Sequence, residues 1–118
     1  MNSRKIGMEK EELACIFLKE QGFSIIETNF WIYGGEIDII AKDGIYLVFV
    51  EVKYRKNNLY GGAFSAITEK KVQLISRCAM YYIKRRAIPP DSPMRFDVIL
   101  IEGNSIHHIK NAFSFYSF

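Results

Sequence analysis

Three charged residues, Asp38, Glu51 and Lys53, stand in two of the most apolar stretches of the sequence. Asp38 interrupts an isoleucine run, and Glu51 and Lys53 close an apolar segment that begins at Tyr46. A charged group inside such a strand is costly unless it has a partner charge, a metal ion or a shifted pKa. Two carboxylates and an amine that converge at one end of a sheet are what metal-assisted cleavage of a phosphodiester needs.

The two segments are predicted to be neighbouring strands, because the Asp43-Gly44 pair between them is typical of a tight hairpin turn. Side chains alternate along a strand, so Glu51 and Lys53 share one face, about 7 Å apart. The hairpin brings Asp38 beside Glu51, and Glu36 shares the face of Asp38. Two adjacent carboxylates repel each other unless a proton or a cation lies between them. We therefore expect Asp38 and Glu51 to hold Mg²⁺ (or Mn²⁺), with Lys53 orienting the attacking water or stabilising the transition state.

An alternative is a structural ion pair at the end of a sheet, between Lys53 and either Glu51 or Asp38. Exposed pairs of this kind are common and contribute about 0 to 1 kcal/mol to stability. Such a pair accounts for one carboxylate in an apolar strand and leaves the second unexplained. Perturbed charges cluster at functional sites without proving one, so both interpretations remain open at this point.

The chain is predicted to form one domain, residues 1–118, with two helices and five strands. A helix should end before Gly22, and another should begin after an N-cap at Thr68. The expected helices are 8–21 and 68–86, and the expected strands are 23–32, 36–41, 45–54, 94–102 and 105–110. The order αβββαββ predicts an α/β fold in the sense of a mixed α+β sheet, with helices against its faces. The segment 45–54 is apolar on both faces, so it should lie centrally.

Composition points to a soluble, ordered domain, since 49% of the residues are apolar and 25% are charged. No apolar run approaches the roughly 20 residues of a membrane span, and no signal peptide is apparent. Cys15 and Cys78 fall among apolar neighbours in the two expected helices, which favours free thiols over a disulfide or a metal site. We therefore expect a cytoplasmic protein that does not bind membranes.

Charge is distributed unevenly, although the net charge is only +3. Residues 1–52 hold five Lys or Arg and nine Asp or Glu, a net charge of −4, whereas residues 53–86 hold nine and one, a net charge of +8. A basic segment next to an acidic one indicates a surface for a polyanion beside an acidic pocket, or only a solvated helix face. In the first interpretation the polyanion is nucleic acid, and DNA is the expected partner. The candidates for contact with its backbone phosphates or stacked bases are Arg55, Lys56, Tyr60, Lys70, Lys71 and Arg77.

Asp38 followed by Glu51-Val52-Lys53 resembles the PD-(D/E)xK signature of the restriction-endonuclease-like superfamily, which includes archaeal Holliday-junction resolvases. The chain as a whole is similar to the small bacterial YraN-like family of endonuclease-like proteins. The residues that carry the similarity are Glu11-Glu12-Leu13-Ala14, Gly22-Phe23, Asn29, Gly35-Glu36-Ile37-Asp38, Val48-Phe49-Val50-Glu51-Val52-Lys53, Arg55, Tyr60-Gly61, Lys70 and Arg95-Phe96-Asp97-Val98.

The resemblance implies a restriction-endonuclease-like nuclease core in which Asp38 and Glu51 are metal ligands and Lys53 is the catalytic lysine. In resolvase-like members a glutamate on the first helix completes the site, and Glu11 matches it. From the residues alone, Glu11 can face the sheet, or it can remain solvated in the first turn, where the helix dipole favours an acid.

Two positions depart from the family pattern. Ile37 stands where the signature often has proline, which this family tolerates. Lys10 stands where relatives usually carry a glycine before Glu11. A lysine there could pair with a site carboxylate or change how the first helix approaches the sheet.

These features predict a Mg²⁺-dependent endonuclease that hydrolyses phosphodiester bonds of DNA with branched or irregular structure. The first alternative is a non-catalytic nucleic-acid-binding module on a nuclease scaffold. The second is a protein-interaction domain that uses the aromatic tail, residues 113–118, which should either cover the sheet edge or join a homodimer partner. Asp97 is expected to have a structural role, fixing Arg95 or Lys53.

Overall fold

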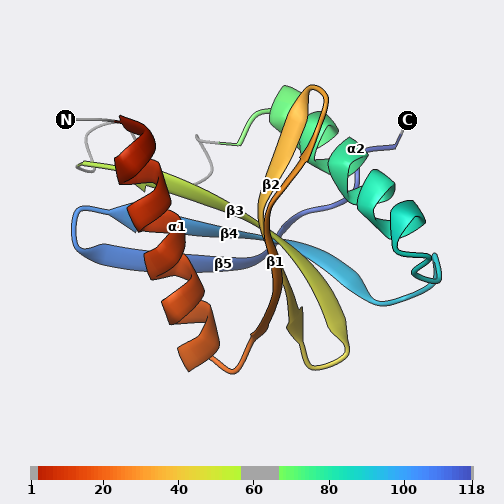
Figure 1. The fold of residues 1–118 in the computed structure, drawn as a ribbon, viewed down its shortest axis with the longest axis horizontal. Coiled ribbons are helices and arrows are strands. Elements are labelled where there is room, and N and C mark those ends of the chain that lie inside the picture. Colours follow the sequence, from red (N-terminus) through yellow and green to blue (C-terminus); the bar gives the residue numbers. More distant parts are fainter. Residues whose placement is uncertain (1–2, 57–66, 118) are drawn as a thin grey trace.

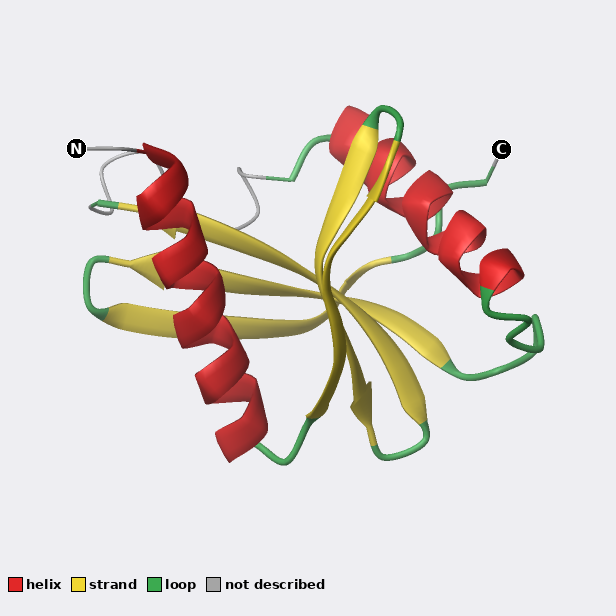
Figure 2. Ribbon diagram, viewed as in Figure 1, coloured by secondary structure: helices red, strands yellow, loops and turns green. Residues whose placement is uncertain are grey.

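The computed structural model describes residues 3–56 and 67–117, which form a five-stranded sheet with two helices (Figure 1, Figure 2). The elements are α1 (Ser3–Glu20), β1 (Ser24–Ile32), β2 (Gly35–Asp43), β3 (Tyr46–Arg55), α2 (Glu69–Arg85), β4 (Met94–Glu102) and β5 (Ser105–Phe113). This order, αβββαββ, confirms the order predicted from the sequence.

Local signals in the sequence explain where the helices end and begin. Gly22 follows α1 with a φ of +95°, a conformation that glycine adopts at little cost. The Thr68 hydroxyl accepts a hydrogen bond from the Lys71 backbone N–H at 3.1 Å and caps α2. α1 begins earlier than predicted, at Ser3, because its polar first residues carry no apolar stripe that would reveal it. β5 extends further than predicted, to Phe113, because its ladder with β4 continues across a bulge.

The sheet has the strand order β1-β2-β3-β4-β5 and is mixed. β3 and β4 run parallel, whereas the other neighbouring strands run antiparallel. A parallel pair needs a crossover connection, and α2 lies in the segment that joins β3 to β4. β3 is the central strand, as predicted, and its residues from Leu47 to Glu51 are all buried.

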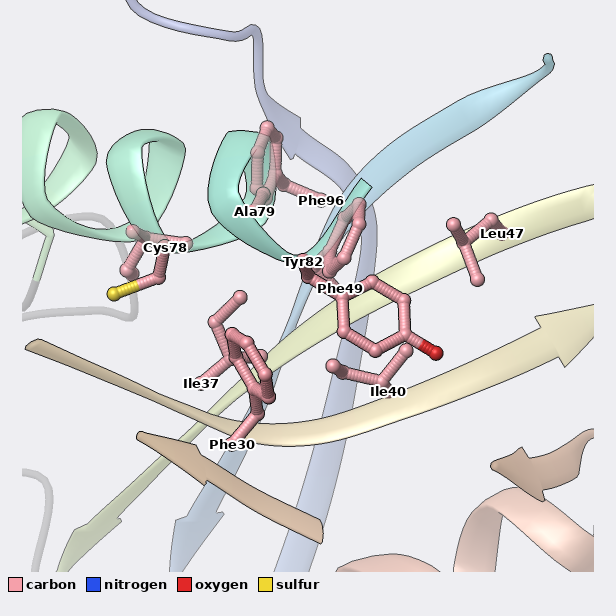
Figure 3. Packing of buried hydrophobic residues seen from close by; sticks show 10 residues of the cluster. Phe30, Ile37, Ile40, Leu47, Phe49, Cys78, Ala79, Tyr82 and Phe96 are labelled. Carbon is pink, nitrogen blue, oxygen red and sulfur yellow. The ribbon is translucent and has the colours of Figure 1, made fainter. Parts of the chain in front are cut away.

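Each face of the sheet carries one apolar cluster, and each cluster holds one helix. α2 packs on the first face, where the ring of Tyr82 lies 6.0 Å from that of Phe49 (Figure 3). α1 packs on the second face, where Leu18 belongs to one cluster with Val48. Side chains of β3 thus alternate between the helices, and this alternation puts Glu51 on the face of α2.

The carboxyl-terminal segment lies on the α2 face of the sheet. The rings of Phe113 and Phe96 stack with centroids 4.8 Å apart, and Phe115 meets Phe96 edge-on at 4.5 Å. The Tyr116 backbone N–H donates a hydrogen bond to the Ser76 hydroxyl at 2.9 Å. The described part of the aromatic tail therefore covers the α2 face of the sheet, next to β4, and not the sheet edge expected from the sequence. A role in a homodimer stays a prediction.

The helices carry both cysteines. Cys15 on α1 is half-buried and Cys78 on α2 is buried, and both are free thiols, as predicted. In the described parts of the chain, no helix is long and apolar enough to cross a membrane.

β2 separates from β3 partway along its length. Their ladder stops at the pair Ile39–Val50, whereas the pairing of β1 with β2 continues to the tip of the hairpin. Figure 1 shows the β1–β2 hairpin rising away from β3, β4 and β5 toward the start of α2. We call this divergence the β2–β3 fork; its arms are residues 35–38 of β2 and residues 51–53 of β3.

Candidate active site

Asp38 is the first residue of β2 beyond the ladder, and its side chain bridges the β2–β3 fork. Asp38 Oδ2 accepts a hydrogen bond from the Val52 backbone N–H at 2.8 Å. In a continued antiparallel ladder this N–H would instead donate to a strand carbonyl, so the carboxylate replaces that carbonyl. The fork thus satisfies a backbone donor and holds Asp38 against β3, next to Glu51.

The carboxyl groups of Asp38 and Glu51 are close enough in the fork for the charge of each to affect the ionisation of the other. Burial and the neighbouring charge of Glu51 together raise the pKa of Asp38 to about 8. Burial also raises the pKa of Glu51, against the opposing influence of Lys71 and Lys53. Since like charges at such close range are costly, we expect the pair to retain one proton at neutral pH. The two carboxylates converge, as the sequence predicted.

Two ammonium groups flank Glu51, whose exposed fraction is only 6%. Lys53 Nζ lies 3.7 Å from Glu51 Oε1, and Lys71 Nζ lies 3.6 Å from the same oxygen. Lys53 comes from β3, two residues beyond Glu51, as predicted. Lys71 reaches Glu51 from the first turn of α2, so a residue predicted to contact nucleic acid lies within the carboxylate site.

Glu11 and Glu36 bring two further carboxylates to Asp38. One oxygen atom from each of the three residues lies within 4.8 Å of the others. Asn29 Nδ2 donates to Glu11 Oε1 at 2.6 Å and to Glu36 Oε1 at 3.1 Å. The pKa of Glu11 is raised overall. Burial is the largest cause; the hydrogen bond from Asn29 opposes it, and the charge of Glu36 adds to it. Of the two orientations expected for Glu11, the structure has the one that faces the sheet.

The donor atoms of this site suit a hard divalent cation. Glu11 from α1 and Glu36 and Asp38 from β2 form one group of possible metal ligands. Glu51 from β3 is the neighbour of Asp38 across the fork. Oxygen ligands of this kind are those preferred by Mg²⁺ and Mn²⁺. Asp38 therefore fits the metal-binding role predicted for it, together with Glu11 and Glu36, which were not predicted as ligands. Glu51 lies outside this group and is paired with Lys53 and Lys71, so its role as a ligand stays a prediction.

The other described residues predicted to contact nucleic acid belong to the same two elements that bring Glu51 and Lys71 to the site, or follow directly on one of them. Arg55 ends β3, and Lys56 follows it as an exposed residue. Lys70 and Arg77 are exposed on α2. Tyr60 lies outside the described residues. The carboxylate group found among the described residues consists of Glu11, Glu36 and Asp38.

Two members of the site were not assigned from the sequence. Glu36 was placed on the face of Asp38 without a role, and Asn29 appeared only among the residues that carry the family similarity. Asn29 has a φ of +53°, a left-handed conformation that asparagine tolerates better than most residues. The signal that could have found both is the pairing of β1 with β2, which puts an amide donor near an acid.

Lys10, expected to pair with a site carboxylate or to alter the approach of α1, contacts an aromatic ring. Its Nζ lies 4.5 Å from the centroid of Tyr54, which follows Lys53 on β3. An ammonium over a ring face is a favourable cation–π contact. This contact joins α1 to the end of β3 beside the site.

A second buried polar cluster surrounds Asp97, apart from the fork. Arg95 Nε donates to Asp97 Oδ1 at 2.9 Å, His108 Nε2 lies 2.8 Å from Oδ2, and the Asn111 backbone N–H donates to Oδ1 at 3.0 Å. Burial alone would raise the pKa of Asp97, but these hydrogen bonds lower it. Asp97 therefore fixes Arg95, one of the two partners expected for it.

The fold and the site together define a class of protein. A five-stranded mixed sheet flanked by two helices, with acids gathered where two strands diverge, is a mixed α+β domain compatible with a restriction-endonuclease-like core. The chain belongs to uncharacterised protein family UPF0102, whose family model matches residues 10–101.

The relatives found by sequence comparison cover nearly the whole chain. A UPF0102 protein from Lachnoclostridium phytofermentans is 44% identical over 116 residues, which is 98% of each chain. A UPF0102 protein from Nitrosomonas eutropha is 43% identical and covers 95% of this chain and 96% of its own. A third, from Thermodesulfovibrio yellowstonii, is 42% identical and covers 92% of this chain and 96% of its own.

Proposed function

We propose that this protein is a metal-dependent endonuclease that hydrolyses phosphodiester bonds of DNA with branched or irregular structure. The observation that carries the proposal is the meeting of Asp38 and Glu51 in the β2–β3 fork, with Lys53 against Glu51. Two neighbouring carboxylates repel each other when both are charged. A divalent cation bound between them would offset that repulsion, as a shared proton does in its absence.

The position of each side chain suggests its role. Asp38 and Glu51 would hold Mg²⁺ or Mn²⁺, and the Val52 N–H keeps Asp38 in place. Lys53 puts a positive charge beside them, suited to stabilise negative charge that develops on the phosphate. The cation, when bound, polarises the phosphate and lowers the pKa of water. Glu11 approaches Asp38 from α1 and is the fourth member of the proposed site.

The charge of α2 supports a nucleic-acid substrate. Lys70, Arg77, Lys84 and Arg85 are exposed on this helix, whose first turn also delivers Lys71 to the site. Cations along one element beside an acidic site can position a phosphate backbone without reading base sequence. A preference for branched or irregular DNA is the part of the proposal that rests on the family resemblance.

Cleavage assays with purified protein test the proposal. Labelled junctions, flaps, linear duplexes and single strands should be incubated with and without Mn²⁺ or Mg²⁺. We expect metal-dependent cleavage that falls at least about 100-fold in Asp38→Ala and in Lys53→Met, since each removes a charge that acts on the transition state. Asp91→Ala, which removes an exposed carboxylate between α2 and β4, is the matched control.

The basic helix also favours a second candidate, a nucleic-acid-binding module without catalysis. Asp38→Ala should leave DNA affinity within a few-fold of wild type under both proposals, because Asp38 is part of the carboxylate cluster and not of the basic surface. DNA binding without metal uptake and without cleavage would favour the binding module. Cleavage that survives in Asp38→Ala would contradict the catalytic assignment.

A further inference from the structure

Glu51 is paired with two lysines that come from different elements. Lys53 and Lys71 both place Nζ within 4 Å of Glu51 Oε1, at 3.7 and 3.6 Å. Their side chains are 29% and 35% exposed, whereas the Glu51 side chain is buried. In the proposed function Lys53 supports phosphodiester hydrolysis, whereas Lys71, predicted to contact nucleic acid, has no role in the metal site itself.

The first turn of α2 determines where Lys71 can reach. The N-cap bond from the Lys71 backbone N–H to the Thr68 hydroxyl fixes its backbone at the start of the helix. Successive residues point in directions about 100° apart on a helix. Lys70, one residue earlier, is exposed, whereas Lys71 is half-buried and directed at Glu51. The helix thus directs Lys70 to the surface and Lys71 to Glu51, although the two lysines are adjacent in the sequence.

We propose that Lys71 is a resident counter-cation of the site, which a divalent cation must displace from Glu51 in order to bind. This inference rests on the proposed function and concerns the regulation of metal uptake at that site. An ammonium group and a divalent cation on the same carboxylate repel each other. After displacement, Lys71 remains attached to the first turn of α2, beside the exposed cations of that helix, where it meets a substrate phosphate.

Removal of the Lys71 charge should therefore strengthen metal binding. At a separation of about 5 Å in a water-like dielectric, the repulsion between a single and a double positive charge corresponds to about tenfold in affinity. Lys70 is exposed, whereas Glu51 is paired with Lys53 and Lys71, so salt screens the charge of Lys70 more effectively. The two lysines should differ in their effect on the metal although they are neighbours in the sequence.

Calorimetric titration of the metal-stripped full-length protein with MnCl₂ tests the inference. Lys71→Met should bind Mn²⁺ about tenfold more tightly than wild type, whereas Lys70→Met should change the affinity by less than about threefold. Lys71→Arg keeps the positive charge and should bind Mn²⁺ with near wild-type affinity. This variant tests the role of the charge even if Lys71→Met does not fold. Circular dichroism before each titration verifies that the variants are folded.

DNA binding provides a second readout. A labelled four-way junction should bind Lys71→Met more weakly than wild type in Ca²⁺, by about fivefold, and equally well in EDTA, where Lys71 is still paired with Glu51. Unchanged or weaker Mn²⁺ affinity in Lys71→Met, or an equal loss of DNA affinity in EDTA, would overturn the inference and leave the proposed metal site standing. If neither wild type nor Lys71→Met takes up Mn²⁺, the inference and the proposed function both fail.

Discussion

Gly35 lies directly against Cys78, so that a Cβ at position 35 would be 2.7 Å from the Cys78 sulfur. The same Cβ would lie 3.7 Å from the Leu74 carbonyl oxygen. The sulfur belongs to a buried residue of α2 and cannot move aside without disturbing the core. The missing side chain at Gly35 therefore allows the tip of the β1–β2 hairpin to lie against α2, at the open end of the β2–β3 fork.

Gly35→Ala should destabilise the protein by about 1 to 3 kcal/mol, because the added methyl group overpacks the contact with Cys78. Urea denaturation measures the free energy of unfolding. In the Cys78→Ala background the sulfur is gone, so the same Gly35→Ala change should cost less than half as much. If Gly35→Ala lowers the free energy of unfolding equally in the wild-type and Cys78→Ala backgrounds, contact with the Cys78 sulfur is not the cause of the destabilisation.

The stability of the metal-free protein should depend on the ionisation of Asp38. Its pKa is raised from 3.8 to about 8 on folding, so between about pH 4 and pH 8 the folded state holds a proton that the unfolded state has lost. The contribution of this group to stability therefore falls as pH rises through that window.

Asp38→Asn removes this titration and keeps an oxygen that can accept the hydrogen bond from Val52. The variant should be more stable than wild type at pH 8 by about 1 to 3 kcal/mol, since an uncompensated buried charge is removed. The advantage should shrink toward pH 4, where Asp38 begins to be protonated in the unfolded state as well. Urea denaturation in EDTA across this range measures it, and a difference independent of pH would contradict the assignment of the raised pKa.

Metal uptake should release a proton. The metal-free pair of Asp38 and Glu51 retains one proton at neutral pH, and a cation on both carboxylates must expel it. Calorimetry in PIPES and in Tris, which differ in ionisation enthalpy, should give about one proton released per Mn²⁺ ion at pH 7. Affinity should also increase between pH 6 and pH 8. Binding with no proton release would show that the ion does not engage Asp38.

Substitution of Asn29 should separate a hydrogen-bonding role from a backbone role. Asn29→Gly and Asn29→Ala both remove the donor shared by Glu11 and Glu36, at a cost of about 0.5 to 1.5 kcal/mol. Alanine is also strained at a φ of +53°, so it should cost about 1 kcal/mol more than glycine. Unfolding in urea at pH 7 with EDTA compares the two, and equal stability would contradict the backbone contribution.

Much of the fold could be predicted from local signals. Gly22 and Thr68 mark helix ends by backbone and side-chain chemistry that acts within a few residues. The apolar run of β3 identifies the central strand without knowledge of its neighbours. The convergence of Asp38 and Glu51 was also predicted, but from a continuous β2–β3 ladder. In the structure the ladder ends at Ile39–Val50, and the Asp38 carboxylate bonds to the Val52 N–H instead. Ile37 and Ile40 both pack in the α2 cluster, so simple alternation fails in the segment where β2 leaves β3.

What could not be predicted depends on contacts between distant segments. Lys71 reaches Glu51 only because α2 packs on the face to which that carboxylate points. Glu11 meets Glu36 only because α1 lies beside the other side of the hairpin, with Asn29 between their carboxylates. No periodicity within one element carries this information, because the packing of helices on the sheet decides it.

The hydrogen bond between Val52 and Asp38 turns one backbone amide into a reporter of the site. The amide ¹H and ¹⁵N resonances of Val52 should follow the protonation of the carboxyl group that accepts from it and should respond again when an ion binds there. Nuclear magnetic resonance of a single labelled valine position would thus read the state of the metal-binding pair in solution, with no nucleic acid present and no turnover required.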